Sequence, residues 1–233
     1  MSYNGPSFDQ LKTLARGIIL RELHADAGVA DDLLDLCVHG AIDDAEDYYD
    51  WETLQATVVT TDAGGPLVTT VGSRLVAKPA RYKGGARLYY LAGNVRKPIA
   101  LSVAGKPISM EWMRENHPDP TQQAAAPVAM CEWGENFLLV PTPSAALTLE
   151  LDAALRTPDL VAGEGEGSRN WFTAHLGQAV LAMAVAGALE ILGEQAAADR
   201  FRGLGQRQVA ARADTEMTAR VRRTPVQMGQ EPT

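Results

Sequence analysis

Four histidines, two cysteines and a cluster of carboxylates are the side chains of this sequence that could hold a metal ion. The histidines are His24, His39, His117 and His175. They share no ligand spacing, and Cys37 with His39 is a lone pair with nothing near it in the sequence to complete the four ligands of a zinc site. We therefore expect neither a metal ion nor another cofactor.

Carboxylates are concentrated between positions 43 and 50. The run includes Asp43, Asp44, Glu46 and Asp47. It lacks the central glycine of a calcium-binding loop, so it is more typical of an exposed helix face. A second acidic segment, the glycine repeat of residues 163–167, has no Lys-Ser/Thr after it, and its two glutamates would repel a phosphate. We interpret this repeat as a flexible hinge.

Catalytic motifs are the next possibility. No nucleophile elbow surrounds any serine, and neither cysteine lies in a motif that would provide a base. Paired acids for glycoside hydrolysis come together only in space, and no pattern points to them. The net charge of −8 gives no basic face that could neutralise nucleic-acid phosphates. The sequence therefore predicts neither an enzyme nor a reader of nucleic-acid sequence.

The charge is distributed unevenly along the chain. Residues 1–56 carry twelve acidic and three basic side chains, whereas residues 169–233 carry six and eight. The last bases are Arg220, Arg222 and Arg223. A solvated acidic face with a basic tail explains this pattern, and so do two ends that meet oppositely charged partners.

The compartment is indicated by the N-terminus and the cysteines. The N-terminus lacks both a basic start and an apolar core, which argues against a signal peptide. We expect no apolar run of membrane-spanning length and no membrane partner. The two cysteines are far apart in the sequence, so a reducing compartment fits best.

The N-terminal quarter predicts two helices. Ser7 and Gln10 have the spacing of a capping box, Gly28 marks a break, and Asp31 begins the second helix. Trp51 follows where that helix should end. We expect its indole to fill the gap between the helices and a β region.

Residues 57–155 predict antiparallel strands. β-branched runs at 57–61 and 67–71 flank a Gly-Gly-Pro turn, which is a hairpin signal. The further expected elements are strands at 74–78, 87–91, 99–103 and 128–131, a turn at 105–107 and a short helix at 109–116. Two apolar runs within Cys131–Leu151 meet at Pro141 and Pro143, which cannot donate to a sheet ladder, so this corner predicts an edge hairpin.

Residues 156–224 predict two helices that pack with the N-terminal pair. Ser168 is the expected N-cap of an apolar helix that ends or bends at Gly193. The helix after it is polar, and its thin apolar face needs another surface to settle on. Residues 225–233 are expected to form a flexible tail. The predicted class is α+β, with a helical bundle of residues 1–56 and 156–224 and an inserted antiparallel β region of residues 57–155.

The order of these features resembles the tailed-phage head-to-tail adaptor proteins, also called connector or head-completion proteins. The resemblance rests on two helices ending near Trp51–Leu54, a β insertion, the strand and corner of Phe137–Pro143, the Leu149–Leu151 strand, Thr157–Leu160, and a closing helical pair around Ala184–Leu192. It spans Phe8 to Arg223. The stretch from Ser102 to Pro127 departs from the family pattern, since it is longer and richer in Ala and Gln.

The resemblance implies a structural protein of the virion at the head–tail junction, assembled in the host cytoplasm. Such adaptors form a homo-oligomeric ring, commonly of twelve copies, that docks on the portal protein and extends the DNA channel. The ring offers a platform to tail or nozzle proteins. Genomic DNA passes through the channel without specific binding.

Two sets of residues follow as expectations from this resemblance. The portal-docking set lies in the last helix and comprises Arg207, Arg212, Met217, Arg220, Arg222 and Arg223. The channel-facing set is acidic, because like charge keeps DNA from adhering to the wall, and comprises Asp43, Asp44, Glu46 and Asp47.

An alternative function from a different class is a β-module that binds a small ligand or glycan. Its stacking platform would consist of Tyr82, Tyr89, Tyr90 and Trp112. Packing of these aromatic rings on the sheet accounts for the same residues.

Overall fold

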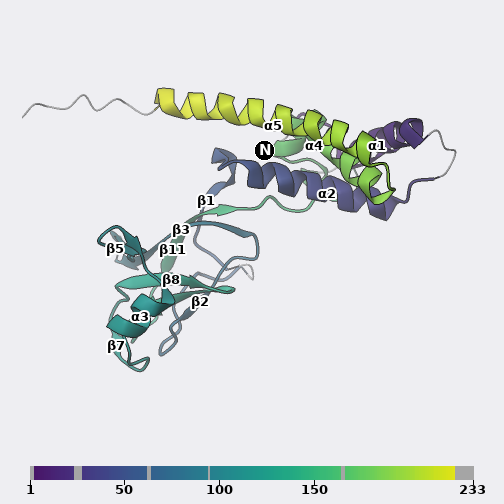
Figure 1. Ribbon diagram of the computed structural model, residues 1–233. Coiled ribbons are helices and arrows are strands. Elements are labelled where there is room, and N and C mark those ends of the chain that lie inside the picture. Colours follow the sequence, from purple (N-terminus) through teal and green to yellow (C-terminus); the bar gives the residue numbers. More distant parts are fainter. Residues whose placement is uncertain (1–2, 24–27, 62–63, 94, 164–165, 224–233) are drawn as a thin grey trace, which may run out of the picture. The chain divides into compact units, whose positions relative to one another are not determined.

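The computed structural model describes residues 3–23, 28–61, 64–93, 95–163 and 166–223 (Figure 1). The chain divides into two compact units. The helical unit is drawn from Met1–Thr53 and Thr157–Thr233, and the β unit from Leu54–Arg156. Helices together with mainly antiparallel sheets place the chain in the expected α+β class.

The helical elements account for most of the first unit and a small part of the second. They are α1 (Phe8–Leu23), α2 (Asp31–Tyr48), α3 (Met110–Asn116), α4 (Trp171–Ile191) and α5 (Gln195–Arg223), with the short 3-10 turns η1 (Glu52–Leu54) and η2 (Glu166–Ser168). In Figure 1, α4 lies among α1, α2 and α5, and it contacts all three.

The first helix begins at the predicted capping box. The Ser7 hydroxyl accepts the Gln10 N–H at 3.3 Å, and the Gln10 side chain accepts the Ser7 N–H at 2.9 Å. Both bonds satisfy donors that the first turn leaves unpaired. α2 starts at Asp31, also as predicted.

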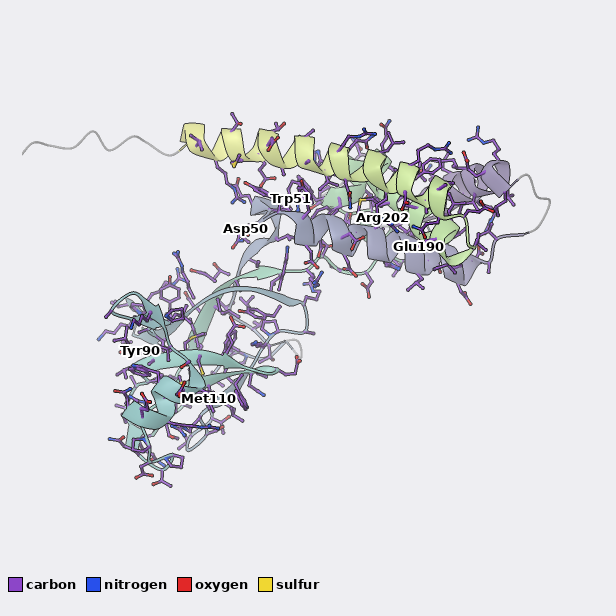
Figure 2. The ribbon with its side chains drawn as sticks, viewed as in Figure 1. Asp50, Trp51, Tyr90, Met110, Glu190 and Arg202 are labelled. Carbon is purple, nitrogen blue, oxygen red and sulfur yellow. The ribbon has the colours of Figure 1, made fainter. Side chains whose placement is uncertain are left out.

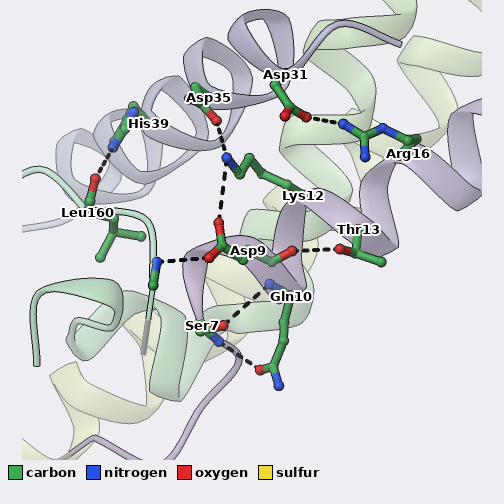
Figure 3. A network of polar contacts seen from close by, with 11 residues as sticks. Ser7, Asp9, Gln10, Lys12, Thr13, Arg16, Asp31, Asp35, His39 and Leu160 are labelled. Carbon is green, nitrogen blue, oxygen red and sulfur yellow. Dashed lines mark hydrogen bonds and ion pairs between the residues drawn. The ribbon is translucent and has the colours of Figure 1, made fainter. Parts of the chain in front are cut away.

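A network of polar contacts joins α1 to α2 (Figure 3). Lys12 Nζ lies 2.8 Å from Asp35 Oδ1 and 3.6 Å from Asp9 Oδ1, and Arg16 pairs with Asp31. The hydrogen bond to Asp35 raises the pKa of Lys12 against the opposing effect of its desolvation. Part of the acidic excess of the N-terminal segment is therefore compensated inside the helical unit.

α4 is the core of the helical unit. Its side chains are buried around most of its circumference, including Phe172, Leu176, Val180 and Leu189. A helix that is apolar on all sides needs neighbours on all sides, and α1, α2 and α5 provide them.

The length of α4 corrects one expectation. Its 21 residues are long and apolar enough to cross a membrane by length and composition, whereas we expected no such run. In this structure 61% of its most apolar window is buried inside the protein, as in the core helix of a globular domain.

The N-cap of α4 is Asn170, so the prediction of Ser168 is wrong. Asn170 Oδ1 accepts the Thr173 N–H at 2.9 Å, and the Thr173 hydroxyl accepts the Asn170 N–H at 3.1 Å. Ser168 is buried at the end of η2, two residues too early to cap α4. The other end was predicted correctly, because Gly193 has a positive φ of 89° and its N–H donates to Glu190 O at 3.1 Å, which closes the helix.

α5 packs along α4 through small residues. Ala198, Gly205, Val209 and Ala213 are its buried positions. A Cβ added at Gly205 would lie 2.4 Å from Met183 Cγ and 3.0 Å from the Ala179 carbonyl, so the glycine permits the close approach of the two helices.

Trp51 is the largest fully buried side chain of the helical unit. Its ring lies 5.3 Å from that of Trp171 and 5.9 Å from that of Phe172, and its Nε1–H donates to Ala45 O at 2.7 Å. These partners belong to the helical unit. The indole therefore closes the core where α2 ends and α4 begins.

The strands belong to the β unit. They are β1 (Gln55–Val58), β2 (Leu75–Ala77), β3 (Tyr82–Ala92), β4 (Val95–Pro98), β5 (Ser102–Val103), β6 (Lys106–Pro107), β7 (Gln123–Ala124), β8 (Ala129–Trp133), β9 (Asn136–Val140), β10 (Thr142–Pro143) and β11 (Leu149–Leu155). The largest sheet has the order β1-β11-β3-β4, and a second has the order β2-β9-β8; both are antiparallel. β10 and β7 form a short parallel pair, and β5 and β6 a short antiparallel one.

The predicted edge hairpin at Pro141 and Pro143 is wrong. β9 lies between β2 and β8, whereas β11 lies between β1 and β3, so the corner passes the chain from the middle of one sheet to the middle of another. The hairpin of this region is β8–β9, which turns at Gly134. Phe137, Leu139, Leu149 and Leu151 are nevertheless buried together in one cluster, as their alternation predicted.

Several other strand predictions need correction. The strand expected at 87–91 is longer, because β3 begins at Tyr82. The turn expected at 105–107 is only partly right, since the chain reverses at Ala104 and Gly105, and Lys106–Pro107 form β6. Ile99–Val103 is not one strand, since β4 ends at Pro98 and β5 begins at Ser102. The chain does reverse where the first hairpin was expected, with the Leu67 N–H donating to Val59 O at 2.9 Å.

The remaining predictions concern both units, and some of them fall outside the described residues. The segment of residues 67–71 forms an isolated bridge at Val68 rather than a regular strand, and positions 62–63 lie outside the described residues. Ser109 caps α3 as expected, and its hydroxyl accepts the Trp112 N–H at 3.1 Å. The acidic glycine repeat and the C-terminal tail fall partly or wholly outside the described residues.

Candidate interaction surfaces

Cys37 and His39 both have structural roles in the helical unit. Within the described ranges, no group of three or more His, Cys, Asp or Glu residues could hold a metal ion. His39 Nε2 donates to Leu160 O at 3.2 Å, as Figure 3 shows, and Cys37 is buried. The pair at positions 37 and 39 therefore takes part in packing the helical unit.

The four predicted channel-facing acids separate into two groups on α2. Asp43, Asp44 and Asp47 are exposed. Glu46 is only 1% exposed, and its carboxylate accepts both the N–H and the hydroxyl of Thr157, the former at 2.9 Å. The prediction for Glu46 is wrong, because this side chain faces inward and holds the chain that returns from the β unit against α2.

Asp44 and Asp47 line a cleft of about 650 Å³ that we call the acidic cleft. Its lining comes from α2, α4 and α5 and comprises Leu36, Cys37, Gly40, Ala41, Asp44, Asp47, Tyr48, Met183, Gly187, Glu190, Arg202, Gln206 and Val209. Arg202 pairs with Glu190 there, and Figure 2 shows the two side chains facing each other from α5 and α4.

The electrostatics of the acidic cleft are dominated by carboxylates. Burial raises the pKa of Asp44, the charges of Asp43 and Asp47 raise it further, and Arg202 opposes them. At neutral pH the cleft therefore combines an apolar floor with excess negative charge. A surface of this kind favours a partner that brings both an apolar side chain and a cation.

The predicted portal-docking residues differ in how exposed they are. Arg207 is exposed and Met217 is 50% exposed, so both are accessible on α5. Arg220 donates to Asp50 O, lies 3.4 Å from Glu216 Oε1 and covers the Tyr49 ring at 5.4 Å. It thereby fastens the end of α5 to the end of α2.

The last two members of this set are Arg222 and Arg223. Both lie in the final turn of α5, and their side chains are outside what the structure describes. Their role in docking stays a prediction.

Arg212 lies in a different environment from the exposed Arg207. Its guanidinium is stacked 5.5 Å from the centre of the Trp171 ring, and its Nε is buried with no hydrogen-bond partner. It lines a second cleft of about 360 Å³, which we call the Arg212 cleft. This lining comprises Pro6, Leu11, Leu14, Thr173, Ala174, His175, Leu176, Gly177, Gln178, Leu181, Gln208 and Arg212.

The aromatic platform of the alternative function is not assembled. Tyr89 and Tyr90 are consecutive in β3 and point to opposite faces of the sheet, and Tyr90 packs on the buried cluster. The ring of Tyr82 is covered by Lys78 at 4.9 Å, and that of Tyr89 by Arg96 at 4.2 Å. The fourth member, Trp112, packs on a separate cluster.

Lys78 and Arg96, the cations over these rings, are paired with acidic side chains, Lys78 with Glu132 at 2.9 Å. Tyr82 OH donates to Glu132, and burial followed by this bond raises the pKa of the phenol strongly. Arg96 lies 2.6 Å from Glu150 and 3.0 Å from Asp152. The hydrogen bond from Thr57 to Asp152 at 2.6 Å lowers the pKa of that carboxyl, and Arg96 lowers it further.

The comparison with protein families decides the class of this chain. A family model described as SU10 adaptor protein matches residues 7–228. The chain belongs to the SU10 adaptor family. A search of curated proteins finds no significant match. Membership in the SU10 adaptor family confirms the class that the order of motifs indicated, a phage adaptor, and the match includes both the helical unit and the β unit.

Reasoning from the sequence of this SU10 adaptor missed both the acidic cleft and the Arg212 cleft. Their floors depend on contacts between residues far apart in the chain. In the acidic cleft, for example, a Cβ added at Gly187 would lie 3.6 Å from Cys37 Sγ. The signal available in the sequence is the number of small residues on α4, which lets neighbouring helices approach closely. For Arg212, the sequence offers no such signal, because it is one of seven arginines in α5.

Proposed function

We propose that this chain is a structural virion protein of the head–tail junction and has no catalytic role. In this proposal a ring of twelve copies, the number that the resemblance to head-to-tail adaptors implies, docks on the portal and extends the DNA channel. It also provides the platform for tail or nozzle proteins and is assembled in the host cytoplasm. The observation that carries the proposal is the family match over residues 7–228.

The accessible part of α5 supports a portal contact. Arg207 and Met217 present a cation and a flexible apolar side chain to solvent, and the backbone of Arg222 and Arg223 continues the same helix. Arginine and methionine are both enriched at protein interfaces. Arg220 serves another purpose in this scheme, since it anchors α5 to its own chain.

The acidic excess of α2 supports a channel through which DNA slides. Carboxylates do not release counterions from phosphates, so they provide none of the attraction that holds a basic surface on DNA. Asp43, Asp44 and Asp47 are the exposed members of the predicted set.

Sedimentation with the portal of the same phage tests this function. We expect the full-length protein to migrate with the portal on a density gradient. The double variant Arg207→Glu, Met217→Asp should lose most of this co-migration, whereas Arg114→Glu, an exposed charge reversal on α3, should retain it. If the unsubstituted protein and its portal migrate separately, the proposed function is wrong.

A further inference from the structure

The acidic cleft and the Arg212 cleft lie on opposite flanks of α5. Residues of α2, α4 and α5 line the acidic cleft, whereas the N-terminal segment, α1, α4 and α5 line the Arg212 cleft. On α5, Gln206 faces the first and Gln208 the second, and residues two apart on a helix point about 200° away from each other. One molecule therefore presents two different hollow faces in two different directions.

The charges of the two faces are complementary. Asp44, Asp47 and Glu190 outnumber Arg202 in the acidic cleft. The Arg212 cleft has no carboxylate in its lining. Arg212 itself forms no ion pair with any residue in the described part of the chain, whereas Arg200 and Arg202 on the same helix each pair with an acid.

Apolar side chains accompany the charges on both faces. Leu36 is 65% exposed and Tyr48 is 52% exposed beside the acidic cleft, and Leu14 is 51% exposed beside the Arg212 cleft. Exposed large apolar side chains at the rim of a concave, charged surface are typical of a protein interface.

We propose that the face of one copy that contains Leu14, Gln208 and Arg212 packs on the acidic cleft of the next copy. This inference rests on the ring of the proposed function and names the contact between its subunits. A contact between two different faces is heterologous, and a heterologous contact builds a ring when the rotation from one copy to the next closes. The partner is a second copy of this chain because the chain itself contains both the unpaired cation and the acid-rich hollow that accepts it.

The contact also refines the roles of the acids on α2. Asp44 and Asp47 would be covered by the neighbouring subunit, where a cation offsets their mutual repulsion. Asp43 does not line the cleft, so it is the member of the three that can still face a channel.

Disulfide trapping between two single-cysteine variants tests the proposed contact. Both variants carry Cys37→Ala and Cys131→Ala, because Cys37 itself lines the acidic cleft. Tyr48→Cys places a thiol beside the acidic cleft, and Gln208→Cys places one beside the Arg212 cleft. We expect a covalent dimer when the two full-length variants are mixed under a copper–phenanthroline oxidant. Ala211→Cys, an exposed position that lines neither cleft, is the control partner and should give none. No dimer in the mixture, or an equally abundant dimer from either variant alone, would overturn the inference.

Charge reversal tests whether Arg212 and the acids face each other. Arg212→Glu in the Gln208→Cys molecule should lower the trapping yield at least about tenfold, because it places like charges together. Asp44→Arg in the Tyr48→Cys molecule should lower it similarly. Mixing the two reversed molecules should restore the yield, which excludes misfolding as the cause. Arg114→Glu provides a reversal of the same size outside both clefts and should leave the yield unchanged. Failure of the mixture to recover would refute the pairing.

The result can be separated from that of the portal experiment. Co-migration with the portal but no trapping would mean that the function holds and the subunit contact is wrong. Trapping without co-migration would mean that the subunit contact is right and the proposed function at the portal is wrong.

Discussion

Two glycines of α5 should respond in opposite directions to the same substitution. A Cβ at Gly203 would meet no atom within 4 Å, whereas one at Gly205 would lie 2.4 Å from Met183 Cγ and 3.0 Å from the Ala179 carbonyl. The glycines are two residues apart in the same helix. Gly203→Ala and Gly205→Ala therefore form a matched pair that differs only in what the added methyl group meets.

The expected magnitude follows from two opposing effects. Alanine in place of an interior helical glycine stabilises a helix by about 0.8–1.0 kcal/mol, and this gain is common to both variants. Overpacking a close contact costs about 1–3 kcal/mol, and this cost applies to Gly205→Ala alone. Gly203→Ala should therefore stabilise the helical unit, and Gly205→Ala should be less stable than Gly203→Ala by about 1–3 kcal/mol.

Urea unfolding followed by circular dichroism at 222 nm measures the difference. The two variants should share a denaturant slope, so that the shift in midpoint converts directly to free energy. If both variants gain the same stability, α5 does not approach α4 as closely as described, and the reasoning about this helix pair is refuted.

Three further predictions concern buried or paired side chains. Trp51→Ala should destabilise the helical unit by about 3–5 kcal/mol in urea unfolding, whereas Trp133→Ala, at a half-exposed indole, should cost far less. Glu46→Ala should cost about 1.5–3 kcal/mol in the same assay, because it removes a charged acceptor from Thr157; an unchanged midpoint would contradict the buried bond. Asp152 has a lowered pKa in the folded state, so its contribution is present above its unfolded pKa of about 3.9 and is lost as the pH falls through the lower folded pKa. Asp152→Asn should therefore flatten the loss of β-unit stability below about pH 4 in acid titrations of unfolding.

Local chemistry made part of the fold predictable. The capping box of Ser7 and Gln10 and the cap at Ser109 involve residues three apart, so a short window of sequence contains all the interacting groups. The N-cap of α4 shows the limit of such windows. Ser168 and Asn170 are both good capping residues, and only the reciprocal bond with Thr173 distinguishes them.

Strand pairing was the least predictable part of the fold. Alternation in Phe137–Val140 and Leu149–Leu155 correctly indicated which side chains are buried. Alternation does not indicate which strand lies beside which. The prediction of a hairpin at the proline corner is wrong for this reason, because the corner connects two sheets.

The sequence indicated the kinds of surface that this protein has, but the roles of the individual residues only in part. The acidic run on α2 was visible, but the partner that buries Glu46 is Thr157, 111 positions away. A buried carboxylate needs such a partner, and composition cannot reveal one. Arg212 was included among the docking residues without the feature that distinguishes it, its stacking on Trp171.

The pairing of β1 with β11 has a consequence for how this protein can vary. These are the first and last strands of the β unit, and their register places Gln55 opposite Ala154 and Ala56 opposite Ala153. Opposed residues of antiparallel strands are only about 5 Å apart, so the chain departs and returns at nearly the same point. A segment with such close ends can lengthen, shrink or be exchanged for a short linker with little change in loop-closure entropy. Related chains are therefore free to differ widely in this insert while keeping the same arrangement of helices.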